Sequence, residues 1–165
     1  MAKRIITKIG DIFCVRLDNG NLRFFQYIAN DLTQLNSSVI RVFKKEYPID
    51  YSFNAEEIVN DDVDFYAHTI LRFGIVENCW EKVGKHTNVG DVEHIMFRMY
   101  TKDALDHRER IWEAWHINKK RFDIGNLNSH YQKSSDLGLV FSYLAVFKRI
   151  KYGFYPGTMF SSEEH

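Results

Sequence analysis

The sequence predicts a mostly β domain of the α+β class: a small, strongly bent antiparallel sheet or partly open barrel with one short helix and a C-terminal helix. Three observations lead to this prediction. Aromatic residues make up 15% of the 165 residues, and aromatic side chains favour strands. A hairpin signature divides two apolar runs near the N-terminus, and the clearest helical pattern lies near the C-terminus.

The N-terminal part predicts three antiparallel strands. An apolar run over residues 11–17 ends at Asp18-Asn19-Gly20-Asn21, a turn signal because Asn and Gly tolerate positive φ. The run resumes over residues 22–29, and residues 39–43 alternate apolar and polar side chains. These strands predict a meander or the beginning of a small barrel.

The middle of the chain predicts one short helix and further strands. Asn54 is the expected N-cap of the helix, with the Glu57 side chain reaching back to it. The further strands are expected at residues 64–71, 77–83, 94–100, 111–118 and 121–124.

The C-terminal part predicts a strand over residues 138–141 and then a helix. Ser142 is the expected N-cap, and Gly153 lies where a glycine often ends a helix. One domain over residues 1–165 is expected from the length, with residues 1–7 and 159–165 flexible.

Composition limits the classes of partner. The 22 basic and 22 acidic residues balance, so nothing favours nonspecific nucleic-acid binding, and nucleic acid is not an expected partner. No run approaches the ~20 apolar residues of a membrane helix, and the N-terminus has no secretion signal, which predicts a cytoplasmic protein with no membrane partner. Cys14 and Cys79 match no metal or redox spacing and are expected to be buried thiols.

The polar residues predict no catalytic site, no metal site and no cofactor. The histidines show none of the i,i+2 or i,i+4 spacings of metal ligands, and no Gly-x-Ser-x-Gly motif or phosphate-binding glycine loop occurs. A dispersed set for RNA cleavage stays open, and its members would be His68, Arg72, Lys85 and His116. For His68 and His116, structural roles are the more common case.

Two charged features have both a plain and a functional interpretation. The acidic cluster is either a solvated face or an anionic surface that steers a basic partner; its members are Glu56, Glu57, Asp61, Asp62 and Asp64. The basic residues 119–121 are either a charged hairpin tip or a nucleic-acid contact.

The three tryptophans lie in predicted strands, where core packing is their usual role. Trp112 and Trp115 are an odd number of residues apart, so they point to opposite faces of a strand. Both are buried only if the strand is covered on both sides. We therefore expect one of the two to be an exposed interface anchor.

Several segments together resemble the immunity protein 26 family. They are Lys8-Ile9-Gly10-Asp11-Ile12-Phe13 with the Asp18-Asn19-Gly20 hairpin, Trp112 to Gly125, and Gly138-Leu139-Val140-Phe141-Ser142 leading to Arg149-Ile150-x-x-Gly153. Two central segments resemble a Bacteroidetes-type branch of that family, namely Phe65-Tyr66-Ala67-His68-Thr69 and Trp80-Glu81-Lys82-Val83-Gly84.

The resemblance implies a small cytoplasmic protein of a bacterial polymorphic toxin system. Such a protein binds and neutralises a cognate toxin domain, often a nuclease, and has no enzymatic site. The resemblance implies no set of toxin-contacting residues. Its motif residues are fold determinants in this interpretation: Gly10, Asp11, Trp80, Gly84, Trp112 and Gly153.

Two functions therefore stay open. The leading one is an immunity protein that occludes its toxin stoichiometrically, with the acidic cluster as docking surface if the toxin is a basic nuclease. The alternative is a small β-barrel nucleic-acid-binding protein or ribonuclease, because Gly10-Asp11-Ile12-Phe13 followed by a hairpin also resembles the barrel ribonucleases of toxin–antitoxin systems. That alternative requires a basic groove and an acid–base set.

Overall fold

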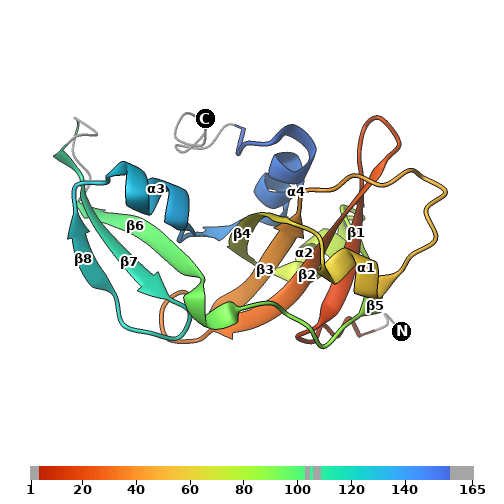
Figure 1. Cartoon of the computed structure of the whole chain (residues 1–165), viewed down its shortest axis with the longest axis horizontal. Helices are drawn as coiled ribbons and strands as arrows, with labels where there is room; N and C mark the ends of the chain where they lie inside the picture. Colours follow the sequence, from red (N-terminus) through yellow and green to blue (C-terminus); the bar gives the residue numbers. More distant parts are fainter. Residues whose placement is uncertain (1–3, 103–104, 106–108, 157–165) are drawn as a thin grey trace.

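The fold is that of a computed structural model, which describes residues 4–102, 105 and 109–156. Two sheets lie side by side, and helices cover the larger one (Figure 1). The strands in the described residues are β1 (Asp11–Arg16), β2 (Leu22–Asp31), β3 (Ser37–Phe43), β4 (Val63–Thr69), β5 (Glu81–Lys85), β6 (Met96–Lys102), β7 (Ile111–His116), β8 (Phe122–Gly125), β9 (Asp136–Leu137) and β10 (Val140–Phe141). The helices there are α1 (Ala55–Val59), α2 (Leu71–Val76), α3 (Ser129–Ser134) and α4 (Tyr143–Tyr152), with a 3-10 turn at Val92–His94.

The larger sheet has six strands in the order β10-β4-β3-β2-β1-β5, and the smaller has four in the order β8-β7-β6-β9. Most neighbours are antiparallel, but β10 runs parallel to β4 and β9 parallel to β6. The α+β class is thus confirmed. The strands divide into two mixed sheets, where a single antiparallel sheet or partly open barrel was expected.

Elements with strong local signals are confirmed. The three N-terminal strands form the predicted meander. Asn54 accepts a hydrogen bond from the Glu57 backbone N–H at 3.2 Å, and Ser142 accepts one from Ala145 at 3.2 Å. Gly153 ends α4 with φ 87°. The predicted flexibility of residues 159–165 concerns a segment outside the described residues.

Two helices were not predicted. Residues 71–76 form α2, which lies between the two strands expected at 64–71 and 77–83. This helix was not predicted because a short apolar run fits either a helix or a strand. Gly74 of α2 lies against the Trp80 ring, where a Cβ would come within 2.0 Å of the indole. The second helix is α3, whose cap Asn128 accepts from the Tyr131 N–H at 3.0 Å.

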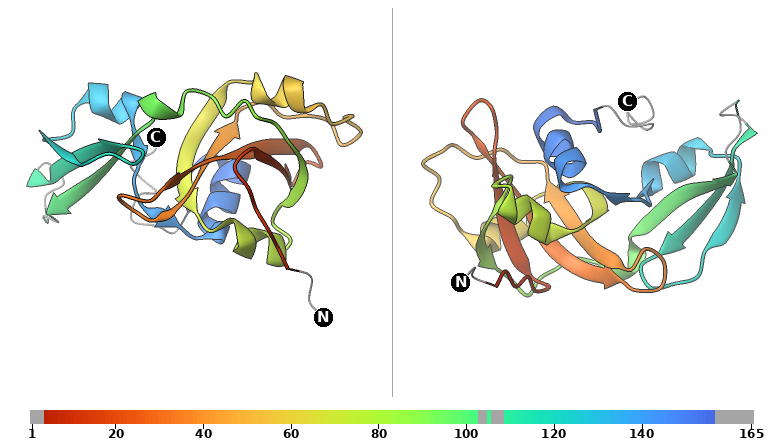
Figure 2. Two further views of the ribbon diagram at one scale, coloured as in Figure 1. Left: turned by 90° about the horizontal axis from the view of Figure 1, so that it is seen from below. Right: turned by 180° about the vertical axis from the view of Figure 1, so that it is seen from behind.

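Both faces of the six-stranded sheet are covered, which explains the continuous apolar runs of β1 and β2. On one face lie α2 and α4 (Figure 2). They cover a core that includes Phe13 stacked on Phe25, with ring centroids 5.0 Å apart. On the other face, Ile58 and Val59 of α1 pack against residues such as Phe24.

A buried carboxylate joins the two sheets. Asp31 lies at the end of β2, and its Oδ2 is 2.9 Å from His68 Nε2 of β4. The same Oδ2 accepts a hydrogen bond from Trp115 Nε1 of β7 at 2.9 Å. Its other oxygen accepts from the Asn118 backbone N–H at 3.1 Å, in the turn after β7. Asp31, His68 and Trp115 are each 0% exposed. These contacts fix the position of one sheet against the other.

Ionisation at this junction favours a neutral histidine beside a charged carboxylate. Burial lowers the pKa of His68 below its ordinary value, although the Asp31 carboxylate opposes this. For Asp31, burial alone would raise the pKa of the carboxyl group. The hydrogen bonds from Trp115, His68 and Asn118 outweigh burial, so the pKa of Asp31 is lowered. Neutral His68 therefore donates its Nε2–H to the carboxylate.

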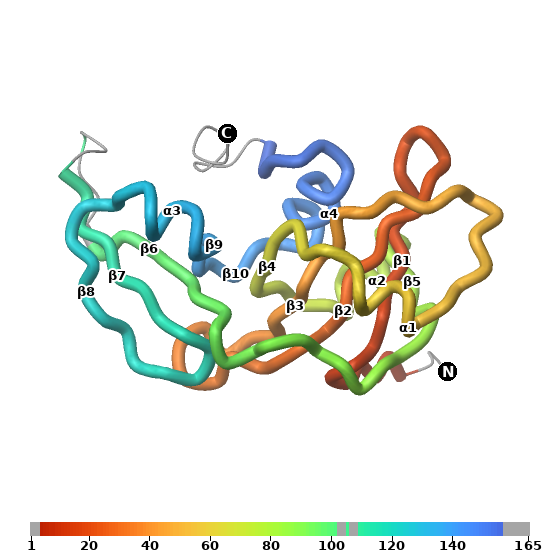
Figure 3. Tube along the Cα trace, in the orientation of Figure 1, coloured from red at the N-terminus to blue at the C-terminus, as the bar shows by residue number. Residues whose placement is uncertain are grey.

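The segment from β9 to β10 passes along both sheets (Figure 3). Gly138 lies between the two strands, and its N–H donates to the Arg98 carbonyl at 2.7 Å. A Cβ at Gly138 would come within 1.9 Å of the Trp115 ring. The absence of a side chain is thus what allows this segment to pass close to the junction.

We predict that Gly138→Ala destabilises the protein by about 1–3 kcal/mol, because the added methyl overlaps the Trp115 indole. The double variant Gly138→Ala/Trp115→Phe should lose less than the sum of the single variants, by about 1 kcal/mol, since the smaller ring makes room. Urea unfolding of the four proteins measures this coupling. Strictly additive losses would show that the two residues do not compete for space.

We also predict that acid destabilises the fold through His68 and then Asp31. The pKa of His68 is lower in the folded protein, so below about pH 6.5 the unfolded chain binds the proton first and stability falls by up to about 1.4 kcal/mol per pH unit. The pKa of Asp31 is also lowered by folding, so its contribution is complete above about pH 4 and is lost as pH falls further.

Urea unfolding of wild type and His68→Gln at about pH 7 and about pH 5 tests the first stage. Glutamine can still donate to Asp31 but does not titrate. The loss of stability between the two pH values should be smaller in the variant. An equal loss in both proteins would assign the pH dependence to other groups.

Candidate functional site

The predicted acidic residues lie on α1, in the segment that follows it and near the start of β4 (Figure 1). Glu56, Glu57, Asp62 and Asp64 are exposed, and Asp61 is half-buried. The cluster is therefore a surface feature, with α1 holding its first two members and β4 its last.

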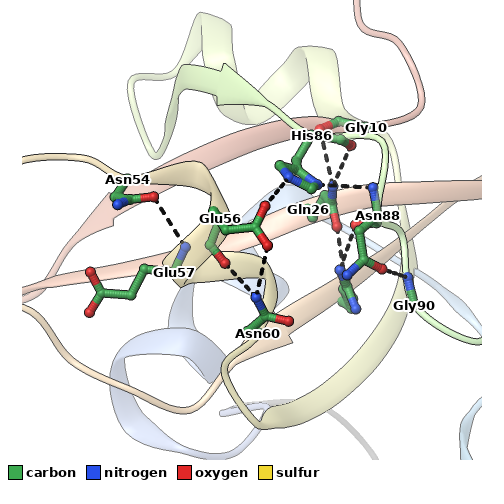
Figure 4. A network of polar contacts seen from close by, with 10 residues as sticks. Gly10, Gln26, Asn54, Glu56, Glu57, Asn60, His86, Asn88 and Gly90 are labelled. Atoms are coloured by element: carbon green, nitrogen blue, oxygen red, sulfur yellow. Dashed lines mark hydrogen bonds and ion pairs between the residues drawn. The ribbon is translucent and has the colours of Figure 1, made fainter.

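Glu56 connects α1 to the loop that follows β5 (Figure 4). Its carboxylate lies 2.7 Å from His86 Nε2, and the Asn60 amide donates to the Glu56 carbonyl at 2.8 Å. His86 Nδ1 accepts from the Asn88 N–H at 3.0 Å, so neutral His86 carries its proton on Nε2 and donates it to Glu56. The Asn60 amide also donates to the other carboxylate oxygen of Glu56, at 3.4 Å, so this carboxylate has a partner on each oxygen.

Buried polar side chains of β2 and β3 also bond to the loop that follows β5 (Figure 4). The Gln26 amide nitrogen donates to the carbonyls of Gly10, at 3.2 Å, and His86, at 3.0 Å. Its oxygen accepts from Arg41 Nε at 2.9 Å, and Arg41 in turn donates to the Asn88 carbonyl at 2.8 Å. The loop is therefore anchored to the sheet below it.

Three further carboxylates have partners within the molecule. Glu57 accepts from the Tyr51 hydroxyl at 2.9 Å and from Lys45 at 3.3 Å, rather than reaching back to the helix N-terminus as predicted. The other two pairs are Asp61 with the Tyr47 hydroxyl, at 2.5 Å, and Asp64 with Arg23, at 2.9 Å.

Two of these pairs, Asp61 with Tyr47 and Asp64 with Arg23, involve buried side chains that also stabilise the fold. Burial, with the Asp61 carboxylate, raises the pKa of Tyr47, so this phenol stays protonated and donates. Arg23 also donates to the carbonyls of Phe43, at 2.6 Å, and Ile150, at 2.8 Å. Asp62 differs from these carboxylates because its side chain is exposed. Its backbone carbonyl accepts a hydrogen bond from the Lys44 N–H at 2.9 Å.

An acidic groove of about 420 Å³ continues this surface toward the smaller sheet. Its carboxylates are Asp64 of β4, Asp91 before the 3-10 turn, and Asp136 of β9. Lys133 and His94 also line it. Asp91 and Asp136 were missed in the sequence because they are far apart along the chain and neither lies in a charged run.

Neither candidate tryptophan is an exposed anchor. Trp112 is 3% exposed and Trp115 0%, so the expectation that one of them reaches the surface is wrong. Their side chains do point to opposite faces of β7, but both faces are covered. Trp112 belongs to the core under α2 and α4, and Trp115 to the cluster at the junction.

The turn after β7 lies at residues 117–118, so the basic residues 119–121 follow this turn and do not form the predicted hairpin tip. Arg121 stacks on the Trp115 ring at 4.4 Å and donates to Gln34 at 2.8 Å. Its side chain therefore stabilises the turn, while Lys119 and Lys120 are exposed.

Predicted fold determinants occupy constrained positions. Gly10 has φ 104°, and a Cβ there would come within 2.8 Å of the His86 carbonyl oxygen. Trp80 is 3% exposed and donates from its indole to the Leu71 carbonyl at 3.1 Å. A Cβ on Gly84 would come within 2.5 Å of the Phe53 ring. These contacts are consistent with structural roles.

The residues considered for RNA cleavage are not brought together. His68 is fully buried at the sheet junction, Arg72 lies on α2, and Lys85 ends β5. His116 Nδ1 lies 3.1 Å from the Ile95 carbonyl. Among the described residues, no group of three or more histidine, cysteine or acidic side chains is arranged to hold a metal ion.

The two cysteines are free thiols with little nucleophilic character. Burial raises the pKa of Cys14 to about 11, with help from Glu81, and burial also raises the pKa of the half-buried Cys79. Cys79 is thus less buried than predicted. No helix in the described part of the chain has the length and apolar character needed to cross a membrane.

No curated protein and no solved structure matches this chain. A family model described as Immunity protein 26 matches residues 8–111, which run from just before β1 to the start of β7 and include the whole acidic cluster. The finer resemblance to a Bacteroidetes-type branch stays a prediction. The chain belongs to the immunity protein 26 family.

Proposed function

We propose that this immunity protein neutralises the toxin domain of a bacterial polymorphic toxin by forming a stoichiometric complex that covers the toxin's working surface. Membership of the family supports an immunity function and a toxin partner. We further propose that the toxin is a nuclease with a basic surface, that the complex forms in the cytoplasm, and that the immunity protein acts by binding rather than by catalysis.

The observation that carries this proposal is the acidic surface, by which we mean the acidic cluster together with Asp91 and Asp136 of the groove. The whole chain has no net charge, so this surface is a local concentration of carboxylates. Nucleases bind phosphates with positively charged surfaces, which are complementary to it.

Part of the acidic surface is also held by bonds within the protein. His86 and Asn60 hold Glu56 and its helix, and Arg23 holds Asp64. A surface whose side chains are already fixed loses less conformational entropy on binding. This preorganisation favours a tight protein–protein contact.

The ribonuclease alternative has less support. It requires an acid–base set at one surface, and the residues considered for it lie on separate elements, with His68 completely buried. A cleavage assay on generic RNA would revive this alternative if activity were found and were lost on changing His116.

We predict that Glu57→Lys/Asp62→Lys weakens binding to the cognate toxin domain by about tenfold or more, mainly through slower association. These two residues are chosen because their side chains are exposed and the bonds of Glu57 to Lys45 and the Tyr51 hydroxyl lie at the surface. Glu56 instead holds the loop after β5, and Asp61 and Asp64 bond to buried side chains. Calorimetry and stopped-flow kinetics measure the effect, and thermal unfolding should be nearly unchanged.

The matched control is Glu77→Lys/Asp123→Lys, which makes the same change in charge at exposed positions just after α2 and on β8. It should bind the toxin like the wild type. Equal affinity of both double variants would remove the acidic cluster as the docking surface. A wild-type protein that neither binds the toxin nor protects cells from it would refute the function itself.

A further inference from the structure

A second pocket, of about 740 Å³, lies at the edge of the six-stranded sheet formed by β5. Two exposed isoleucines, Ile6 and Ile9, form part of its lining. The lysines Lys8, Lys82 and Lys85 also line it, and we call it the lysine pocket. It combines apolar surface with cationic groups, as ligand sites often do.

A β-bulge turns two of these lysines to the same side. Between β1 and β5, Ile12 pairs with Gly84 and Phe13 with Lys82, so Val83 is an extra residue. Residues three apart in a regular strand point to opposite faces, but the extra residue places Lys82 opposite Phe13 and Lys85 opposite Asp11, on one face. The bulge thus concentrates positive charge at this pocket.

The pocket has more positive than negative charge. Its carboxylate, Asp11, is 1% exposed, lies 2.9 Å from the Lys82 ammonium, and accepts the Lys8 backbone N–H at 2.8 Å. The ammonium groups of Lys8 and Lys85 are on exposed side chains. With Asp11 already paired to Lys82, these two charges are available to an anionic partner.

The lysine pocket and the acidic surface meet at His86. This residue lines the pocket, and its Nε2 lies 2.7 Å from Glu56 of α1 (Figure 4). A partner lying across the β5 edge would therefore meet positive charge on one side and negative charge on the other. Such a pattern favours one orientation of the partner, because the reversed one places like charges together.

We propose that the lysine pocket receives an acidic segment of the toxin, with carboxylates next to an apolar side chain, while the toxin's basic surface faces the acidic surface. This inference rests on the function proposed above. The lysines complement the carboxylates, Ile6 and Ile9 complement the apolar side chain, and the volume of the pocket accommodates several side chains. Exposed sheet edges are frequent sites for binding an extended segment.

The test is Lys8→Glu/Lys85→Glu, which leaves the Lys82–Asp11 ion pair intact. Toxin affinity should fall by about tenfold or more, with slower association and a weaker dependence on salt. The control is Lys119→Glu/Lys120→Glu, the same change in charge at exposed positions just after the turn that follows β7, which should bind within about twofold of wild type.

Two further measurements keep the inference falsifiable. Lys8→Gln/Lys85→Gln removes the charges without reversing them and should give a smaller loss in the same direction. The backbone amide signals of residues 82–87 should shift when the toxin domain is added. Unshifted signals, or a lysine variant that binds like its control, would overturn the inference while leaving the immunity function intact. Failure of the wild type to bind would instead refute the proposed function.

Discussion

The buried carboxylate of Asp31 is the constraint on which the arrangement of the molecule depends. It accepts hydrogen bonds from both sheets, through His68 of β4 and Trp115 of β7, so neither sheet can shift without leaving a buried charge unpaired. The acidic groove takes Asp64 from the larger sheet and Asp136 from the smaller. The shape of that groove is therefore set by the same junction, and a loosened junction would alter the proposed binding surface as well as the stability.

Local signals made part of this fold predictable from sequence. The turn at residues 18–21 and the caps Asn54, Ser142 and Gly153 act within a few residues, and the structure confirms each. The two-sheet arrangement was not predictable, because the groups bonded to Asp31 are 37, 84 and 87 residues away along the chain. The short apolar run of α2 gave no periodicity to separate helix from strand.

The candidate surfaces were likewise predictable only where their residues are close together in the sequence. The acidic cluster is nearly contiguous in sequence, whereas Asp91 and Asp136 join it only through the fold. For the tryptophans, odd spacing correctly gave opposite faces of β7, but spacing carries no information on whether both faces are covered. The lysine pocket depends on the bulge at Val83. Gly84 beside it is a local signal for a bulge, but it does not indicate which side chains the bulge brings together.

The carboxylates of the acidic surface do not contribute equally to binding. A basic side chain of a partner that pairs with Asp64 must compete with Arg23, which is 7% exposed and bonded to two backbone carbonyls. Displacing that guanidinium would leave a buried charge unpaired, which costs more than a new surface ion pair returns. Glu57 pairs with the exposed Lys45 and with the hydroxyl of the half-buried Tyr51, and the Asp62 side chain is exposed. The attraction for a basic partner should therefore come mostly from these two residues, with the internally bonded carboxylates keeping α1 and its loop in place.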